Sequence, residues 1–323
     1  MAVAILIFSP FLKFSYFRIT YSFVSEDTFQ IASSLVENPP PLRIRVVVRS
    51  EKRIKVNLLN CISGNSEGLW EIIMDRNYPP NPDYIIGDQY VDIESIRFLP
   101  TPKAEISTTD LLSTTEALVS QIQSLYPNVR FNLVFDSVCH VSPFQTWPFI
   151  GHADKIKIYE TSLVPVEESF QSLLRPHQEL YINNRGIKFT KPLNLKKIEI
   201  KSFDDYFDED HFKFFTCKHL IVHAYNLTAD LSVVFFEQWI NGVNEMLRTF
   251  KLEQANKFFL LWKLNPLQYT GGKRVYEIDS KVIECSNGYD IMRKDGTVGT
   301  LNFTPNQEVS TKEDLIFVVW AGH

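Results

Sequence analysis

The feature that most constrains the fold is an alternation of strand-like and helix-like segments in the second part of the chain. The strand-like runs begin at residues 131, 155, 179, 197, 219 and 249, so their starts lie 18 to 30 residues apart. Segments with apolar residues at helical spacing, such as VEESFQSLL and LSVVFFEQWINGVNEML, lie between several of them. This alternation predicts parallel strands joined by crossover helices. The interval is also typical of leucine-rich-repeat solenoids, whose period is about 20–29 residues.

We therefore expect an α/β fold, in the form of an irregular leucine-rich-repeat-like solenoid of alternating strands and helices. The repeats should be irregular because the chain lacks the LxxLxLxxN consensus. A doubly wound α/β domain is the competing fold. It would normally show a glycine-rich turn between a strand and a helix, and the sequence has no such turn.

Other parts of the chain carry different patterns. Three consecutive prolines, residues 39–41, stop any helix that precedes them. The following segment, LRIRVVVRSEKRIKVNLL, alternates apolar and polar residues around a turn and predicts an antiparallel hairpin. The expected organisation is an N-terminal segment at 1–38, a β layer at 42–100, a repeat-like βα region at 110–255, a β-meander at 256–305 and a C-terminal strand or tail at 306–323.

The first residues, MAVAILIFSPFLKFSYF, are apolar but do not form a convincing signal peptide. No basic segment precedes them, and Pro10 and Lys13 interrupt the run. The run is also too short to span a bilayer. We expect a buried helix here, or an end left by an imperfect gene model, and no membrane association.

Composition excludes several classes of function. The net charge of −5 and the absence of long basic runs argue against nucleic-acid binding. The four cysteines lie far apart and form no CxxC pair, which favours a reducing compartment, cytoplasmic or nuclear, with inert thiols.

No motif predicts a cofactor, a catalytic centre or a metal. The Gly271–Arg274 segment lacks the flanking residues of a phosphate-binding loop. Cys217, His219 and His223 share one face of a strand, but Cys217 and His223 would lie some 20 Å apart at about 3.3 Å per residue. We expect ordinary histidines on a sheet surface there.

Two tight-turn dipeptides lie near the end of the chain. Asn287-Gly288 and Asp295-Gly296 are strong signals for hairpin turns of type I′, in which both central residues have positive φ. Gly288 and Gly296 should therefore matter for stability. Trp239 should be a core residue, because it shares a helix face with Val234, Phe235 and Met246.

Three blocks of the sequence carry a resemblance to a known family. GYDIMRKDGTVGTLNF resembles the closing motif of the nematode F-box-associated type 2 domain, which typically ends in G-x-D-I-x-R-x-D-G-x-x-A/G-T. FEQWING, followed by Leu247 and TFKLE, resembles the helix-to-strand element of that family. The hairpin with Trp70 after it is similar to the strands that follow the F-box. The resemblance covers about residues 42 to 305.

The resemblance implies a function in protein recognition. Members of the family usually begin with an F-box, which docks on a Skp-family adaptor of cullin-RING ubiquitin ligases. Residues 1–38 depart from that pattern, since they lack a leucine-proline start, and we interpret them as a degenerate or truncated F-box-like segment. The implied function is that of a non-catalytic substrate receptor of an SCF-type ubiquitin ligase, with a protein substrate and an adaptor and cullin as partners. The alternatives are an orphan interaction domain without a ligase link and a cytosolic α/β enzyme with a non-contiguous site.

The strands at 155, 179, 197, 219 and 249 also predict where a partner binds. Their apolar side chains should face the helices, which leaves the alternate residues on the opposite face of the sheet. This face mixes tyrosine with both signs of charge, as protein interfaces do, although a merely solvated sheet face is the other interpretation. The predicted partner-binding residues are Lys157, Tyr159, Tyr181, Asn183, Glu199, Lys201, His219, His223, Lys251 and Glu253.

Overall fold

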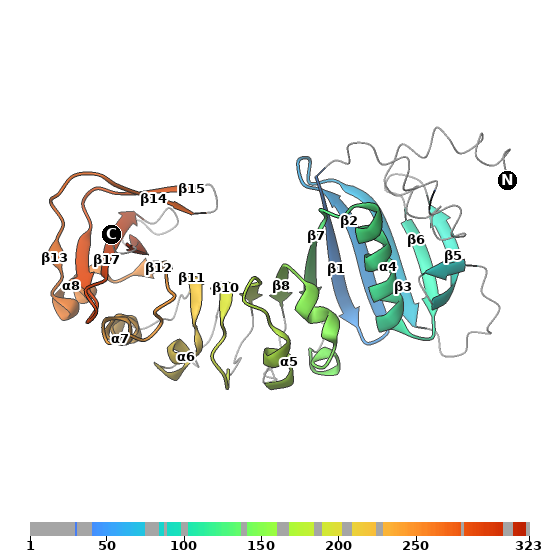
Figure 1. Cartoon of the computed structure of the whole chain (residues 1–323), viewed down its shortest axis with the longest axis horizontal. Coiled ribbons are helices and arrows are strands. Elements are labelled where there is room, and N and C mark those ends of the chain that lie inside the picture. Colours follow the sequence, from blue (N-terminus) through green and yellow to red (C-terminus); the bar gives the residue numbers. More distant parts are fainter. Residues whose placement is uncertain are drawn as a thin grey trace. The chain divides into compact units, whose positions relative to one another are not determined.

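The computed structural model is a mixed α/β protein in which strands predominate over helices (Figure 1). It describes residues 30, 41–74, 84–86, 89–97, 103–136, 141–159, 168–183, 189–201, 209–223, 229–278, 281–305 and 313–320. The F-box-like segment predicted at 1–38 lies outside these residues except for Gln30. The chain divides into two compact units, Met1–Pro143 with Trp147–Lys157 and Phe144–Thr146 with Ile158–His323. We call them unit 1 and unit 2.

Unit 1 contains a sheet with one long helix. Its strands are β1 (Leu42–Ser50), β2 (Arg53–Asn60), β3 (Ser66–Met74), β4 (Tyr84–Ile86), β5 (Gln89–Arg97), β6 (Lys103–Thr108) and β7 (Arg130–Phe135). The β1–β2 and β2–β3 pairs are antiparallel, whereas β6 joins β3 and β7 joins β1 in parallel. The run at 131, which the sequence pattern groups with the repeats, therefore belongs to the N-terminal sheet as β7.

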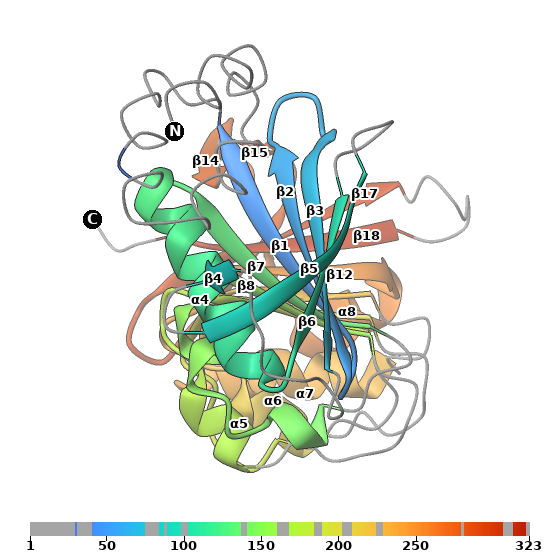
Figure 2. The same ribbon diagram turned by 90° about the vertical axis from the view of Figure 1, so that its right-hand side faces the viewer.

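Helix α4 (Leu111–Leu125) closes one face of this sheet (Figure 2). It begins where expected, because the Asp110 side chain accepts a hydrogen bond from the Ser113 N–H at 3.1 Å and so caps the first turn. Its apolar residues recur at helical spacing, and Leu111, Leu118 and Ile122 are buried against the strands. The alternation of LRIRVVV puts Ile44, Val46 and Val48 on the same buried side.

Unit 2 begins with strands and short helices in alternation. The elements are α5 (Glu168–Leu173), β9 (Glu179–Ile182), β10 (Leu195–Ile200), α6 (Glu209–Phe214), β11 (Cys217–Val222), α7 (Ala229–Ile240) and β12 (Thr249–Ala255). β9, β10, β11 and β12 are consecutive parallel neighbours, which confirms the parallel pairing expected for these runs. Strand β8 (Lys155–Ile158) spans the boundary between the units.

The chain then returns through antiparallel strands. These elements are α8 (Lys257–Leu264), β13 (Leu267–Gln268), β14 (Arg274–Ile278), β15 (Lys281–Cys285), β16 (Tyr289–Met292), β17 (Val298–Pro305) and β18 (Glu313–Val319). β18 pairs with β12, and β17, β16 and β13 follow it in that order. β14 and β15 form a separate hairpin. The helix α8, at the start of the region predicted as a β-meander, is a feature that the sequence pattern missed.

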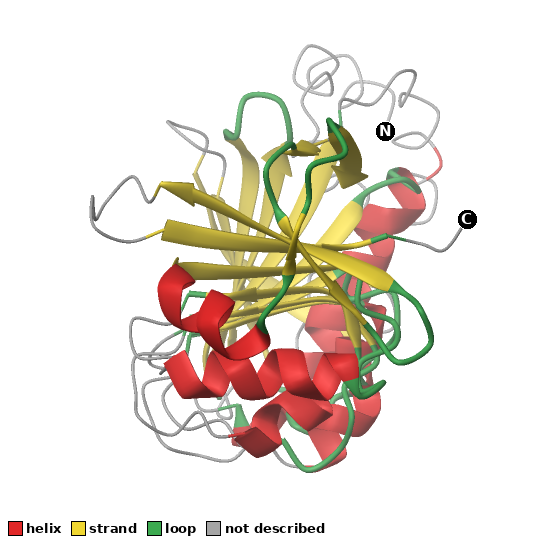
Figure 3. Ribbon diagram, turned by 90° about the vertical axis from the view of Figure 1, so that its left-hand side faces the viewer, coloured by secondary structure: helices red, strands yellow, loops and turns green. Residues whose placement is uncertain are grey.

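An aromatic layer holds the helices of unit 2 to the sheet. Phe235 on α7 lies 4.2 Å from Phe250 on β12, measured between ring centroids, and 5.1 Å from Phe212 on α6. Trp239 packs edge-on against Phe317 of β18 at 4.9 Å. Figures 1 and 3 show α5, α6 and α7 on one side of the strands, so the other side of this sheet is not covered by these helices.

Candidate functional site

The strands of the repeat-like region have one apolar face, as their alternation predicts. All ten apolar residues that were expected to face the helices are buried: Ile156, Ile158, Leu180, Ile182, Ile198, Ile200, Leu220, Val222, Phe250 and Leu252. This part of the prediction is confirmed. The physical reason is that successive side chains of a strand point to opposite faces, and only the helix-covered face can bury apolar area.

The ten residues predicted to form the opposite face are all half-buried in the structure. Lys157 belongs to unit 1, and the other nine, from Tyr159 to Glu253, belong to unit 2. Strand register places Tyr181 beside Glu199, then Ile221 and Lys251 on the next two strands. The nine predicted residues of unit 2 therefore share one continuous face of its parallel strands with Ile221. We call this face, on the side opposite the buried apolar residues, the open face.

The residues that directly follow β9, β10 and β11 continue the backbone hydrogen bonding between neighbouring strands in a regular way. The N–H groups of Asn183, Lys201 and His223 donate hydrogen bonds of 2.7 to 2.9 Å to a carbonyl on the preceding strand. Each acceptor is the last buried isoleucine of that strand: Ile158, Ile182 and Ile200, respectively. The same local geometry is thus repeated three times.

His223 lies between two carboxylates at the centre of the open face. Its Nε2 lies 3.2 Å from Glu199 on β10, and its Nδ1 lies 2.9 Å from Glu253 on β12. The hydrogen bond with Glu199 raises the pKa of His223 above 6.5, burial opposes this, and the contact with Glu253 adds to the increase. The arrangement therefore favours an imidazolium ion with both ring nitrogens occupied.

Lysines complete the charge balance around this histidine. Lys197 lies 3.2 Å from Glu199, and Lys251 lies 3.1 Å from Glu253. Burial tends to raise the pKa of Glu253, but the hydrogen bonds with His223 and Lys251 lower it overall. Both glutamates of this network are therefore paired with basic side chains.

Tyr159 and Tyr181 form an aromatic pair on the open face. Their ring centroids lie 5.3 Å apart with an interplanar angle of 48°. Burial raises the pKa of Tyr181, and the neighbouring Tyr159 and Glu199 add to the effect. The pair is a half-exposed apolar surface with two hydroxyl groups, which suits contact with a protein.

His219 lies apart from the Glu199–His223–Glu253 network. Its Nδ1 is 3.0 Å from the Thr249 hydroxyl, and it lines a small cavity of about 340 Å³ together with Lys218, Arg248 and Tyr276. Tyr276 comes from β14, so the β14–β15 hairpin reaches this end of the open face. This contact could not be predicted from the sequence, because β14 lies far along the chain from β11.

The Cys217, His219 and His223 series is not a ligand set. Cys217 is fully buried, and burial raises the pKa of its thiol to about 12, whereas His223 is engaged by two glutamates. Within the residues that the structure describes, no group of three or more His, Cys, Asp or Glu side chains is placed to hold a metal ion.

Two residues of the open face, Lys197 and Asp314, are not among the ten that were predicted from the sequence. Lys197 has the same strand parity as Glu199 and could have been found from the alternation in KKIEIK. Asp314 could not, because it comes from β18, where its carboxylate accepts a hydrogen bond from the Gln254 N–H at 3.2 Å and lies 4.0 Å from Lys251.

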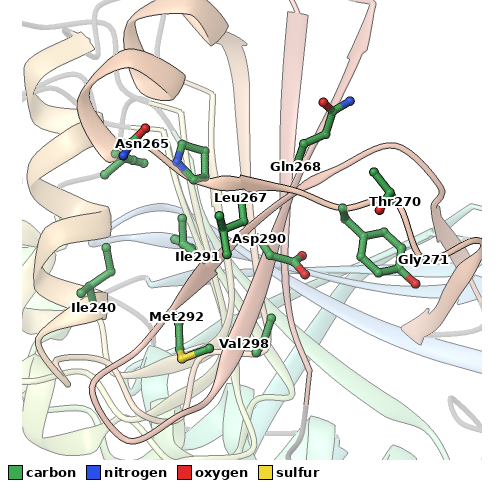
Figure 4. A pocket seen from close by; sticks show the side chains of 13 residues that line it. Ile240, Asn265, Leu267, Gln268, Thr270, Gly271, Asp290, Ile291, Met292 and Val298 are labelled. Atoms are coloured by element: carbon green, nitrogen blue, oxygen red, sulfur yellow. The ribbon is translucent and has the colours of Figure 1, made fainter.

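A larger cavity, of about 590 Å³, lies elsewhere in unit 2 (Figure 4). The side chains labelled there come from α7, β13, β16, β17 and the loop segments on both sides of β13. Its lining is mostly apolar, with Ile240, Leu264, Leu267, Met292 and Val298 among the residues that form it.

Asp290, which also lines this cavity, belongs to a closed polar network. Its carboxylate accepts a hydrogen bond from the Thr300 hydroxyl at 2.5 Å and from Arg274 Nη1 at 3.0 Å. The Thr300 hydroxyl in turn accepts from Arg274 and from Trp320 Nε1, at 3.0 and 2.7 Å. Because Arg274 also stacks 3.6 Å above the Tyr269 ring, these groups hold β14, β16, β17 and the end of β18 together.

Three further residues of the closing motif, Arg293, Asp295 and Gly299, also have a structural role. Arg293 makes a bidentate contact with Asp295, from Nε at 3.0 Å and Nη2 at 2.5 Å, and its guanidinium lies 5.6 Å from the Trp239 ring centroid. The hydrogen bond from Arg293 holds the pKa of Asp295 well below its usual range. A Cβ on Gly299 would lie 2.2 Å from the Phe317 ring, so only glycine fits beneath that ring.

The prediction of type I′ turns is wrong at both dipeptides, although Gly296 does have the positive φ that was expected of it. Gly296 has φ +89°, but Asp295 does not have positive φ. The turn is closed by a hydrogen bond from the Gly296 N–H to the Arg293 carbonyl. This is the three-residue loop with a left-handed glycine, and not type I′. Gly288 does not have positive φ at all. A Cβ there would lie 2.3 Å from Thr300 Cγ2, so close packing requires this glycine.

Comparison of the chain with family models, with curated proteins and with solved structures found no match. No helix in the described part of the chain is both long enough and apolar enough to cross a membrane.

Proposed function

We propose that the protein is a non-catalytic recognition module that binds a protein partner on the open face of unit 2. The observation that carries this proposal is the Tyr159–Tyr181 pair, which stands half-buried on a sheet face that the helices leave uncovered. Tyrosine is enriched in protein interfaces because it offers a large, rigid contact area with a polar end.

A solenoid-like repeat is the finer architecture that we propose for residues 155–255. The repeated ladder contacts of Asn183, Lys201 and His223 and the consecutive parallel register of β9 to β12 support it. In solenoids each repeat packs mainly against its neighbours, and the exposed sheet face is the usual binding surface.

The charge network of the open face favours recognition over acid–base catalysis. A general base needs a ring nitrogen that is free to take a proton, whereas both nitrogens of His223 contact carboxylates. The same network would orient a partner through complementary charges, since a lysine and a glutamate of opposite sign follow each other along β10 and again along β12.

We further propose, from the resemblance of the closing block and of FEQWING, that the module presents a protein substrate to an SCF-type ubiquitin ligase in the cytoplasm or nucleus. An adaptor of the Skp family and a cullin would then be partners. An orphan interaction domain without a ligase link is the alternative. Co-precipitation separates the two, because an adaptor and a cullin should be recovered with a ligase receptor and not with an orphan domain.

The binding surface is tested by replacing both tyrosines. The Tyr159→Ser/Tyr181→Ser variant should lose the partners that the unmodified chain captures, while Tyr159→Phe/Tyr181→Phe, which keeps both rings, should retain most of them. Melting curves of the variants must match that of the unmodified protein. If the serine variant is folded and captures the same partners, the open face is not the binding surface.

A further inference from the structure

The cavity of about 590 Å³ lies beside an edge of the sheet of unit 2 where the last strand, β13, is very short. β13 is the last strand on this side, and it pairs with only two residues of β16, Tyr289 and Asp290. Antiparallel register would next place Pro266 beside Ile291 and Asn265 beside Met292. Within the described residues, no strand occupies those positions on the free edge of β16.

The sequence explains why β13 stops there. Pro266 has no backbone N–H, so it cannot donate to a strand partner. Asn265 has φ +44° and ends α8 in the left-handed conformation, with its N–H on the Leu261 carbonyl. A residue held as a helix cap cannot also extend a strand. The edge beside Met292 is therefore left open by the way that α8 ends.

The backbone of Met292 is oriented toward this open edge. Both backbone groups of Arg293 point toward the turn before β17. Its N–H donates to the Thr297 carbonyl, and its carbonyl accepts from the Gly296 N–H. Because consecutive residues of an antiparallel strand alternate between its two neighbours, Met292 presents its N–H and carbonyl to the other side. On that side, Leu267 pairs with Asp290, and the Lys294 N–H donates to the Ile240 carbonyl at 3.0 Å. Met292 lies between these two contacts.

Two exposed apolar side chains lie at this site. We call the open edge at Met292, together with the cavity beside it, the window. Leu267 is 75% exposed and Met292 is 62% exposed, and both line the cavity. α8 ends at Leu264, which also lines the cavity. Leu267 and Met292 are two of the eight large exposed apolar residues in the described part of the chain, and both belong to this one cavity.

The cavity suits an apolar side chain better than a charged one. Ile240, Leu264 and Val298 form part of its wall. Its one carboxylate, on Asp290, already accepts hydrogen bonds from Thr300 and Arg274, and therefore has little left to offer a cationic group. A side chain that enters this space would gain by removing apolar area from water.

We propose that this window binds an extended segment of a partner protein, which pairs through its backbone with Met292 and places an apolar side chain of leucine or phenylalanine size in the cavity. Strand addition at a free sheet edge combines backbone hydrogen bonds with side-chain pockets in this way. The site is distinct from the open face and does not depend on it. It adds a linear, apolar recognition element to the proposed recognition function.

The proposal is tested with synthetic heptapeptides labelled with fluorescein and measured by fluorescence anisotropy against the full chain. One pool has random residues around a fixed central leucine, a second has aspartate at the centre, and a third has the leucine pool N-methylated at the central leucine, the residue that would pair with Met292. The leucine pool should bind, and both other pools should bind at least tenfold more weakly, because one lacks the apolar anchor and the other lacks the backbone donor.

Two protein variants locate the site. Met292→Lys should weaken binding of the leucine pool at least tenfold, whereas Val282→Lys, which changes an equally exposed residue on β15, should leave it unchanged. Binding that survives both N-methylation and Met292→Lys overturns the proposal, as does equal loss in the two variants. A dimer that Met292→Lys dissociates in sedimentation experiments would make a second copy of the chain the occupant and would also overturn it. The Tyr159→Ser/Tyr181→Ser variant should bind the leucine pool normally, so failure of the open-face proposal is distinguishable.

Discussion

Gly288 shows how a single residue can be required for a reason that a turn motif does not reveal. Its φ lies outside the left-handed region, so a side chain would cause no backbone strain. A Cβ, however, would meet Thr300 Cγ2 at 2.3 Å and the Leu301 carbonyl oxygen at 2.9 Å. The residue is therefore constrained by packing between β16 and β17.

Gly288→Ala should lower the free energy of unfolding by about 1–3 kcal/mol, which is typical of overpacking. Thr300→Ser removes the clashing methyl group but keeps the hydroxyl that contacts Asp290 and Trp320. The double variant should therefore recover part of the loss, as measured by urea denaturation in a double-mutant cycle. Additive effects of the two substitutions would contradict this account.

His223 makes the stability of unit 2 depend on pH. Glu199 on β10 and Glu253 on β12 face its ring, and Lys197 and Lys251 pair with those acids. The pKa of His223 is raised in the folded protein above 6.5. The stabilisation that the protonated His223 ring contributes is therefore fully present below pH 6.5. It is lost as the pH rises through the raised pKa of the folded protein.

His223→Gln should accordingly destabilise the protein by about 1 kcal/mol at about pH 5.5 and by much less at about pH 9. The lower pH is chosen above 4.5, the ordinary pKa from which that of Glu253 is lowered, so that this carboxylate stays ionised. The measurement is the free energy of unfolding in urea at each pH. An equal effect at both pH values would show that the imidazolium charge does not contribute.

At the scale of elements, α7 and α8 are both rich in aromatic residues but differ in what they bury. α7 places Phe235, Phe236 and Trp239 against the sheet, and all three are inaccessible to solvent. α8 buries only Leu260 and leaves Trp262 72% exposed, in a cation–π contact with Lys263. The core position predicted for Trp239 is thus confirmed, whereas Met246, predicted for the same helix, lies beyond its end and is exposed.

Trp239→Ala should cost about 3–5 kcal/mol of stability, because it leaves a cavity between Phe317 and Gly299. The matched control is Trp262→Ala on α8, which should change stability by less than about 0.5 kcal/mol. Urea denaturation of both variants measures the difference. Similar losses in the two variants would show that Trp262 is buried in the folded protein, which would contradict the exposed position of its side chain.

At the scale of the whole molecule, each unit has a cluster in which partly buried charges are neutralised by other side chains. In unit 1, Glu71 is buried among Arg53, Lys55 and Lys103, with its nearest contact at 2.8 Å. Burial opposes ionisation, but the hydrogen bond from Lys103 and the charge of Lys55 lower the pKa of Glu71. In unit 2 the glutamates around His223 are balanced in the same way. The carboxylates of these two clusters thus already have protein partners.

We therefore expect the chain to fold without a metal ion. Dialysis against a chelator should leave the melting temperature of the full chain unchanged, and elemental analysis of the untreated protein should find no stoichiometric zinc or calcium. A melting temperature that falls on chelation and recovers with one added metal would contradict this expectation.

The sequence alone determined which residues of the strands at 155, 179, 197, 219 and 249 are buried, because strand alternation is a local property. For the same reason it placed nine residues of the open face on the side of unit 2 opposite these buried residues, and helical spacing placed Trp239 in the core. Only the tertiary structure decided which strands become neighbours. The run at 131 joins β1, Asp314 reaches the open face from β18, and β13 leaves the edge at Met292 free. These outcomes depend on contacts between residues far apart in the chain, which no local pattern encodes, and on close packing such as that of Gly288 against Thr300.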